Sequence, residues 1–324
     1  MTVTRFLHGY LPNGSGARTS SLSRWYRPCE LVTGLAPKLF RHGSGGRGDR
    51  SVANPKGGPM TLIHHVVTGD GPLPIVFVHG FACAHGDWDN QVAHLSPRHR
   101  TVAVDLRGHG ASPGTAEECS IERYGADVAE VMRALALRPA VLVGHSMGCR
   151  VVVEAALQAP RQTAGVILVD GSQFASAMEP MLMERFATSE GYATITNALF
   201  NDMFTPKSDK AVAAAVVERA FRLPRAIGQK MLSDMLRYDV GRLTSTLASL
   251  RTPVMAVQTT YSNEKRERQT MRDGQTTPWL DMLRASVPSA CIEIIPDTGH
   301  FPQLDESART NAAIDRFVAT LPVR

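Results

Sequence analysis

The sequence has little of what marks a membrane protein or a disulfide-stabilised secreted one. No apolar run approaches the roughly 18 residues that a membrane-spanning helix needs. The five cysteines among 324 residues are scattered, odd in number and form no C-x-x-C pair. A disulfide framework or a thiolate zinc site is therefore not expected. We predict a protein without a membrane span, located in a reducing compartment, with the cytoplasm favoured.

Positive charge is also scarce outside one segment. The formal net charge is +5, but residues 1–59 hold nine Lys or Arg against two acidic residues. The remaining 265 residues therefore sum to −2. Because a basic face is what attracts nucleic acid, this distribution argues against a nucleic-acid partner for the body of the protein.

Residues 1–59 show no hydrophobic period and contain Gly-rich breaks such as 43–46 and 57–58. We expect this basic extension to be mostly disordered and dispensable. Its Arg-rich, acid-poor composition also resembles an organellar transit peptide, and import into an organelle is the less favoured hypothesis.

From residue 60 onward, short β-rich runs alternate with helical stretches. Several runs are apolar on both faces, as buried parallel strands must be. This rhythm predicts an α/β fold with a mostly parallel, doubly wound sheet. The expected strands are Leu62–Val67, Ile75–Val78, Val102–Asp105, Ala140–Val143, Val166–Val169, Val254–Gln258 and Ile292–Ile295, and the expected helices are Ile121–Leu137, Met147–Gln158 and Ser307–Leu321.

One segment, residues 172–248, breaks the rhythm because it has no strand signal. We expect a helical cap inserted into a core made of residues 60–171 and 249–324. The insertion is rich in methionine and phenylalanine, side chains that adapt to apolar ligands but that also build local cores. The candidate substrate-pocket residues are Phe174, Phe200, Met203 and Phe204.

A candidate nucleophile is Ser146, within Gly144-His145-Ser146-Met147-Gly148 between a predicted strand and a predicted helix. The glycines permit a tight turn that lifts the serine hydroxyl above the sheet edge. A serine needs a general base and a place for the charge that develops on the carbonyl oxygen. His300, after the last strand, is the candidate base. The backbone N–H groups of Phe81 and Met147 are the candidate oxyanion hole.

Four motifs together resemble the α/β-hydrolase superfamily, and within it the lid-bearing branch of esterases, lactonases and C–C hydrolases. They are His79-Gly80-Phe81 with Trp88, the run Asp105 to Ser112, Gly144 to Gly148, and Gly299-His300-Phe301. The resemblance covers residues 60–324 and implies a cofactor-independent serine hydrolase acting on a small-molecule ester or lactone of mainly apolar character. We interpret His109, in the second motif, as structural.

The acid of the triad departs from the common pattern of that superfamily. Members commonly carry an Asp shortly after the strand that here is Val254–Gln258, but none follows it closely. Some members place the acid after the preceding strand, which here is Asp170, and we favour that residue. Asp273 is the second choice and Glu264 the third. The mixed charges of 264–268 otherwise suggest a solvated helical face.

Other chemistries have weaker support. The His64-His65 pair and the His79–His85 spacing bring no carboxylate at metal-ligand spacing, so we expect no metal site. No G-x-G-x-x-G or P-loop follows a strand, so we expect no cofactor. Two alternatives use the same fold: a C–C bond hydrolase or cofactor-free oxygenase, and a ligand receptor without turnover.

Overall fold

The computed structural model describes residues 62–174, 179–263 and 267–322. Two predictions fall outside these residues. They are the disorder of the extension 1–59 and the candidate acid Glu264.

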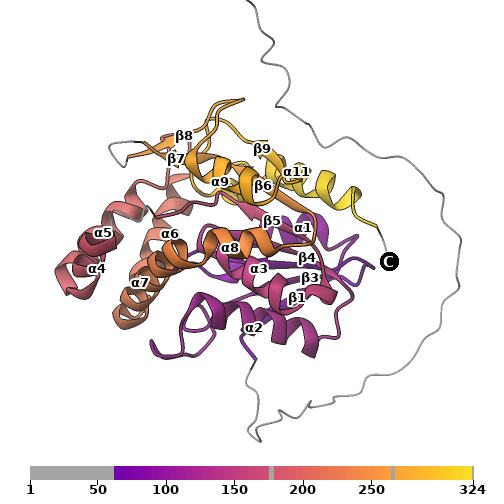
Figure 1. Cartoon of the computed structure of the whole chain (residues 1–324), viewed down its shortest axis with the longest axis horizontal. Coiled ribbons are helices and arrows are strands. Elements are labelled where there is room, and N and C mark those ends of the chain that lie inside the picture. Colours follow the sequence, from indigo (N-terminus) through magenta and orange to yellow (C-terminus); the bar gives the residue numbers. More distant parts are fainter. Residues whose placement is uncertain (1–61, 175–178, 264–266, 323–324) are drawn as a thin grey trace, which may run out of the picture.

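A seven-stranded sheet forms the centre of the fold, in the order β1-β3-β2-β4-β5-β6-β9 (Figure 1). Only β1 runs antiparallel to its neighbour, so the predicted mostly parallel sheet is confirmed. The strands are β1 (His65–Thr68), β2 (Ile75–Val78), β3 (Thr101–Val104), β4 (Ala140–His145), β5 (Thr163–Val169), β6 (Val254–Gln258) and β9 (Cys291–Ile294).

The central strands are buried on both faces. The runs IVFV, TVAV and VMAVQ of β2, β3 and β6 are buried at every position. Their alternate side chains enter two separate apolar clusters, one on each face of the sheet. Two clusters require two helical layers, and this accounts for the doubly wound arrangement.

Helices cover both faces of the sheet. Helices α1 and α11 pack together over one face, and α2 and α3 pack together over the other, where α8 contacts α3. The core helices are η1 (His85–Trp88), α1 (Asp89–Leu95), α2 (Ile121–Ala134), α3 (Met147–Gln158), η2 (Pro160–Gln162), α9 (Pro278–Ser286), α10 (Pro302–Asp305) and α11 (Ser307–Ala319).

The described residues between β5 and β6 form five helices. They are α4 (Glu179–Ala187), α5 (Ser189–Asn201), α6 (Lys210–Phe221), α7 (Arg225–Gly241) and α8 (Leu243–Ser249). Helix α4 lies at the left of Figure 1, whereas the C-terminal end of α5 reaches strand β8 (Arg268–Thr270), where Asp202 accepts a hydrogen bond from the amide of Arg268 at 2.7 Å.

Two ion pairs, one buried and one part-buried, connect this helical segment to the core. Arg150 of α3 pairs with Asp239 of α7 at 2.5 Å, and both side chains are buried. Arg219 of α6 donates two hydrogen bonds to Asp87 of η1, at 2.5 and 2.7 Å. Because breaking a buried pair leaves an uncompensated charge, these contacts fix where the helices sit over the sheet.

The helical reading of residues 264–268 is wrong where the structure describes it. Arg268 begins strand β8 (Arg268–Thr270), which pairs antiparallel with β7 (Thr260–Ser262). The charge pattern suggested a solvated face, whereas the Arg268 side chain is only 13% exposed.

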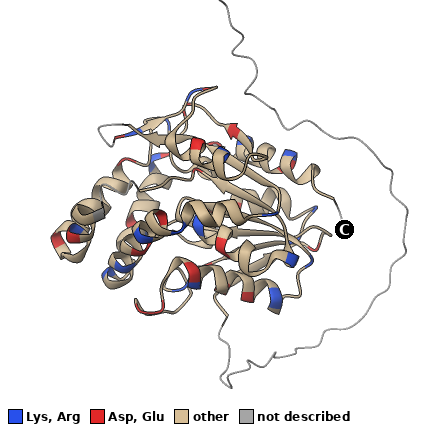
Figure 2. Cartoon of the chain, viewed as in Figure 1, with Lys and Arg blue, Asp and Glu red and all other residues tan. Residues whose placement is uncertain are grey.

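The described residues show neither a face of one charge in Figure 2 nor a helix of the membrane-spanning type. Figure 2 shows basic and acidic residues interspersed over the helices, with no face of one sign in this view. Among the described helices, none is long and apolar enough to cross a membrane.

Candidate active site

Ser146 occupies the sharp turn between β4 and α3. Its backbone has φ 54° and ψ −112°, a conformation that L-residues rarely adopt. Glycines allow the turn to close, because a Cβ at Gly144 would lie 2.2 Å from the carbonyl oxygen of Gly148. A Cβ at Gly148 would likewise lie 2.6 Å from the carbonyl oxygen of Val78. The predicted strand–turn–helix setting of Ser146 is therefore present.

His300 lies on the loop after β9 and is held from three sides. Its Nδ1 lies 2.6 Å from Oδ2 of Asp170, and both side chains are buried. Its backbone N–H donates to the carbonyl oxygen of Met203 at 2.8 Å. Its own carbonyl oxygen lies 2.7 Å from Nε2 of His145, the residue before Ser146. The imidazole is thus tied to the serine turn, to the helical insertion and to a carboxylate.

Asp170 follows β5 at the carboxyl edge of the sheet and accepts several further hydrogen bonds. Oδ1 accepts from Nε2 of Gln258 at 2.9 Å and from the amides of Thr259 and Thr260 at 2.8 Å each. Oδ2 also accepts from the Thr260 hydroxyl at 2.6 Å. Burial alone would raise the pKa of Asp170, but the hydrogen bond from His300, the nearby positive charge and the hydroxyl hold it below its ordinary value. Asp170 is therefore ionised at neutral pH.

An ionised Asp170 fixes the tautomer of His300. A carboxylate only accepts hydrogen bonds, so the proton of the neutral imidazole lies on Nδ1. Nε2 then carries a lone pair, and it is buried without a hydrogen-bond partner among the described residues. Burial, followed by the charge of Arg268, lowers the pKa of His300 below its ordinary value. The ring is thus neutral at pH 7 and able to accept a proton at Nε2.

Arg268 lies behind the His300–Asp170 pair and was not predicted as a site residue. Its Nη1 donates to the Thr260 hydroxyl at 2.8 Å and lies 3.2 Å from Nδ1 of His300 and 3.9 Å from Oδ2 of Asp170. Since Nδ1 already donates to Asp170, the contact with His300 is one of charge rather than a hydrogen bond. Burial lowers the pKa of Arg268. No sequence pattern signals this residue, because its place depends on the β7–β8 hairpin.

The loop after β2 lies against the serine turn. A Cβ at Gly80 would lie 3.3 Å from Cβ of Ser146 and 2.9 Å from Nδ1 of His145. Only a glycine lets the two loops approach this closely. Within the described residues, the amides of Phe81 and Met147 donate no hydrogen bond to another backbone or side-chain group. Both donors are therefore free to bind a ligand oxygen.

The candidate pocket residues of the helical insertion differ in their contacts with the loops of the site. Phe200 is buried with its ring 6.3 Å from that of Phe81, and Met203 contacts His300 through its backbone. Phe204 stacks on Phe301, with ring centroids 5.1 Å apart. Phe174 lies at the edge of the large apolar cluster, where its amide donates to Asp239. The first three lie beside the loops of the site.

The second-choice acid is placed differently from Asp170. Asp273 is exposed on the loop after β8. Within the described residues, the side chains that pair with the His300 imidazole are those of Asp170 and Arg268, and Asp273 is not among them. The structure therefore brings Asp170, and not Asp273, to the imidazole.

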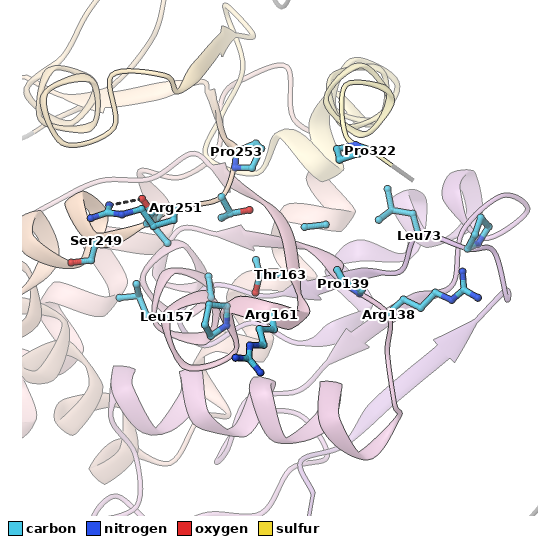
Figure 3. A pocket seen from close by; sticks show the side chains of 16 residues that line it. Leu73, Arg138, Pro139, Leu157, Arg161, Thr163, Ser249, Arg251, Pro253 and Pro322 are labelled. Carbon is cyan, nitrogen blue, oxygen red and sulfur yellow. Dashed lines mark hydrogen bonds between the residues drawn. The ribbon is translucent and has the colours of Figure 1, made fainter. Parts of the chain in front are cut away.

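A large hollow lies at the opposite edge of the sheet (Figure 3). It has a volume of about 830 Å³ and is lined at the amino ends of β4, β5 and β6 by Pro139, Thr163 and Pro253. Its described lining holds no histidine or carboxylate. Because Ser146 and Asp170 lie at the carboxyl ends of the strands, this hollow is separate from the candidate active site.

The chain is similar in sequence to known proteins. A relative named as the dihydrolipoyllysine-residue acetyltransferase component of an acetoin cleaving system, from Cupriavidus necator, is 25% identical over 268 residues, which are 79% of this chain and 66% of the relative. The chain thus spans slightly less than two thirds of that relative.

An esterase and an enol-lactonase are examples of solved structures that share the fold. A thermophilic esterase from Thermogutta terrifontis has a TM-score of 0.65 at 23% identity, covering 79% of this chain and 92% of the esterase. An enol-lactonase from Burkholderia xenovorans has a TM-score of 0.65 at 18% identity, covering 79% of this chain and 96% of the lactonase. The profile of the alpha/beta hydrolase family matches residues 75–313, and the chain belongs to that family.

Proposed function

We propose that the protein is a serine hydrolase that cleaves carboxylic esters or lactones through an acyl-enzyme on Ser146. The observation that carries the proposal is the 2.6 Å contact between Nδ1 of His300 and Asp170, which leaves a neutral Nε2 with a free lone pair. The strained turn that presents Ser146 adds support. Esterase and enol-lactonase neighbours of the same fold are consistent with this class.

The proposed reaction begins with proton transfer from the Ser146 hydroxyl to Nε2 of His300. The serine oxygen attacks the acyl carbon, and the amides of Phe81 and Met147 stabilise the oxyanion that forms. Asp170 stabilises the imidazolium through the hydrogen bond at Nδ1. The imidazolium then protonates the leaving alkoxide as the C–O bond breaks. Water activated by the same imidazole hydrolyses the acyl-enzyme, returning the serine.

We assign substrate selection to the helical insertion. Residues 172–248 form the proposed cap and residues 60–171 with 249–324 the proposed core. Phe200, Met203 and Phe204 lie beside the loops of His300 and Phe81, so a substrate reaching Ser146 would meet apolar side chains. A mainly apolar acyl or alkyl group fits these walls. No cofactor is required for this chemistry.

Turnover of a panel of p-nitrophenyl esters, aromatic esters and lactones tests the proposal. The wild type should hydrolyse at least one class, and Ser146→Ala should abolish turnover without changing the melting temperature by more than a few degrees. Ser172→Ala, an exposed serine on the loop after β5, is the matched control and should retain activity. Turnover by Ser146→Ala equal to that of the wild type would refute the assignment, and a wild type that binds but turns over none of the panel would favour the receptor alternative.

A further inference from the structure

A second carboxylate–histidine cluster lies at a different strand end. His64 precedes β1, His85 begins η1, and Asp105 follows β3. Nδ1 of His64 lies 2.9 Å from Oδ2 of Asp105, and Nδ1 of His85 lies 3.0 Å from Oδ1. The Asp105 side chain is 1% exposed, whereas those of His64 and His85 are 38% and 32% exposed. Three segments distant in sequence thus converge on one carboxylate that solvent approaches from the histidine side.

This cluster is distinct from the proposed active site. Asp105 follows β3 and Asp170 follows β5, and β2 and β4 lie between these strands in the sheet. Neither His64 nor His85 has a role in the proposed hydrolysis. The sequence predicted no metal site because the spacing of its histidines brought no carboxylate, and the carboxylate is supplied by a strand end that only the fold places there.

The carboxylate of Asp105 is held in a fixed orientation. The amide of His85 donates to Oδ1 at 2.8 Å, and the amide of Ala111 donates to Oδ2 at 2.9 Å. A Cβ at Gly110 would lie 2.2 to 2.4 Å from the carboxylate atoms, so the following loop closes against it. A carboxylate that is oriented by two amides is a preorganised ligand, in the way that outer partners orient metal ligands.

The spacing of the ligand atoms suits one metal ion. Zn²⁺ binds imidazole nitrogen at about 2.0–2.1 Å and carboxylate oxygen at about 2.0–2.2 Å. A nitrogen and an oxygen bound at a tetrahedral angle lie about 3.4 Å apart, so the two N···O distances here, 2.9 and 3.0 Å, would lengthen by about half an ångström when the ion binds. One ligand atom from each of His64, His85 and Asp105 lies within 4.8 Å of the others. Two nitrogens on one Zn²⁺ lie at most about 4.2 Å apart, so at most a small rotation of a part-exposed imidazole completes the arrangement.

We propose that His64, His85 and Asp105 form a binding site for a divalent transition-metal ion of the Zn²⁺ type. Two imidazoles and one carboxylate favour Zn²⁺, Co²⁺ or Ni²⁺ over Mg²⁺ and Ca²⁺, which prefer all-oxygen sites. Solvent completes the coordination on the exposed side. Binding cross-links the segment before β1, the loop after β3 and η1, which begins four residues after Phe81, and therefore stabilises the native state.

Titration of the full-length protein with Zn²⁺ by calorimetry, and with Co²⁺ by visible absorption, tests the site. The wild type should bind one equivalent with a rise in melting temperature that EDTA reverses. His64→Ala and His85→Ala should each weaken this binding by at least tenfold. His94→Ala is the matched control, because His94 is also 38% exposed and pairs with a carboxylate, that of Asp315 at 2.7 Å. It should bind as the wild type does.

Three results would overturn the proposal. They are no stoichiometric binding of Zn²⁺ by the wild type, binding by His64→Ala and His85→Ala that is as tight as that of the wild type, or a loss of binding in His94→Ala as large as in those two variants. Circular dichroism establishes that each variant folds, and His85→Asn replaces His85→Ala if the latter does not. Failure of the proposed hydrolase activity would leave this titration unaffected, since none of the three residues belongs to the proposed triad.

Discussion

Asp170 and Asp105 each follow a strand and contact the imidazole nitrogens of histidines, but the two carboxylates differ in how deeply their partners are buried. Asp170 binds one imidazole at 2.6 Å in a buried site with a guanidinium behind it. Asp105 binds two imidazoles at 2.9 and 3.0 Å, each about one third exposed. The same donor and acceptor types therefore suit different tasks. A buried single pair holds a proton-accepting Nε2 at neutral pH, whereas a part-exposed pair of imidazoles leaves room for a metal ion and its water.

The largest expected effect is that of a substitution at Asp170. Asp170→Asn should lower kcat by about three to four orders of magnitude, because the amide no longer fixes the tautomer or stabilises the imidazolium. Asp273→Asn, an exposed aspartate of the neighbouring loop, should stay within about tenfold of the wild type. Steady-state kinetics on the best ester substrate measures both. A small effect for Asp170→Asn with a large one for Asp273→Asn would move the acid to Asp273.

Buried histidines should make the fold sensitive to mild acid. Burial lowers the pKa of His79 and of His145 from 6.5 to about 3, and that of His109 to about 4. Below pH 6.5 the unfolded chain binds more protons at these histidines than the native one. The free energy of unfolding therefore decreases as the pH is lowered. Each histidine contributes a loss of about 2 kcal/mol between pH 8 and pH 5. Urea denaturation at the two pH values measures the loss, and an unchanged midpoint and slope would contradict it.

Apolar side chains of the helical insertion lie beside His300 and should set which acyl chains the enzyme prefers. Phe204 stacks on Phe301 beside His300, so Phe204→Ala should change the ratio of kcat/KM between short and long acyl chains by about 10- to 200-fold, the scale of 1–3 kcal/mol. Phe221→Ala on α6, where the side chain is 52% exposed, is the matched control and should leave the ratio unchanged. A uniform loss across all chain lengths in Phe204→Ala would indicate a packing role instead.

Arg268 places a positive charge beside His300 and Asp170. Its guanidinium lowers the pKa of His300, so a neutral side chain there should let that pKa rise. In Arg268→Leu, the acid limb of kcat/KM should move to higher pH. Arg272→Leu, exposed on the loop after β8, is the control. A fall in kcat/KM with an unmoved acid limb would show that Arg268 acts by packing alone.

Local patterns predicted the scaffold and the core of the candidate site. The sheet follows from runs such as Ile75–Val78 that are apolar at every position, and the serine turn follows from its two glycines. Asp170 was favoured over Asp273 because some members of the superfamily place the acid after this strand, and a residue that directly follows a strand also lies at the carboxyl edge of the sheet. That physical argument agrees with the observed contact between Asp170 and His300.

The contacts that the sequence did not reveal depend on long-range placement. Arg268 was read as part of a solvated helical face, because three-residue strands such as β7 and β8 leave no period to detect. Asp105 contacts His64 and His85, which are 41 and 20 residues away in the sequence. No spacing rule relates these positions. The fold decides both sites, since the loops that deliver Arg268, His64 and His85 are placed by tertiary packing rather than by local propensity.

Covalent labelling tests the central claim most directly. The wild type, treated with an aryl organophosphonate and digested, should carry the adduct on Ser146 by mass spectrometry, in one equivalent and with loss of ester hydrolysis. Asp170→Asn should label far more slowly, while Asp273→Asn should label at the wild-type rate. An adduct on a cysteine or on another serine, or full labelling with unchanged activity, would contradict the assignment of Ser146 as the nucleophile.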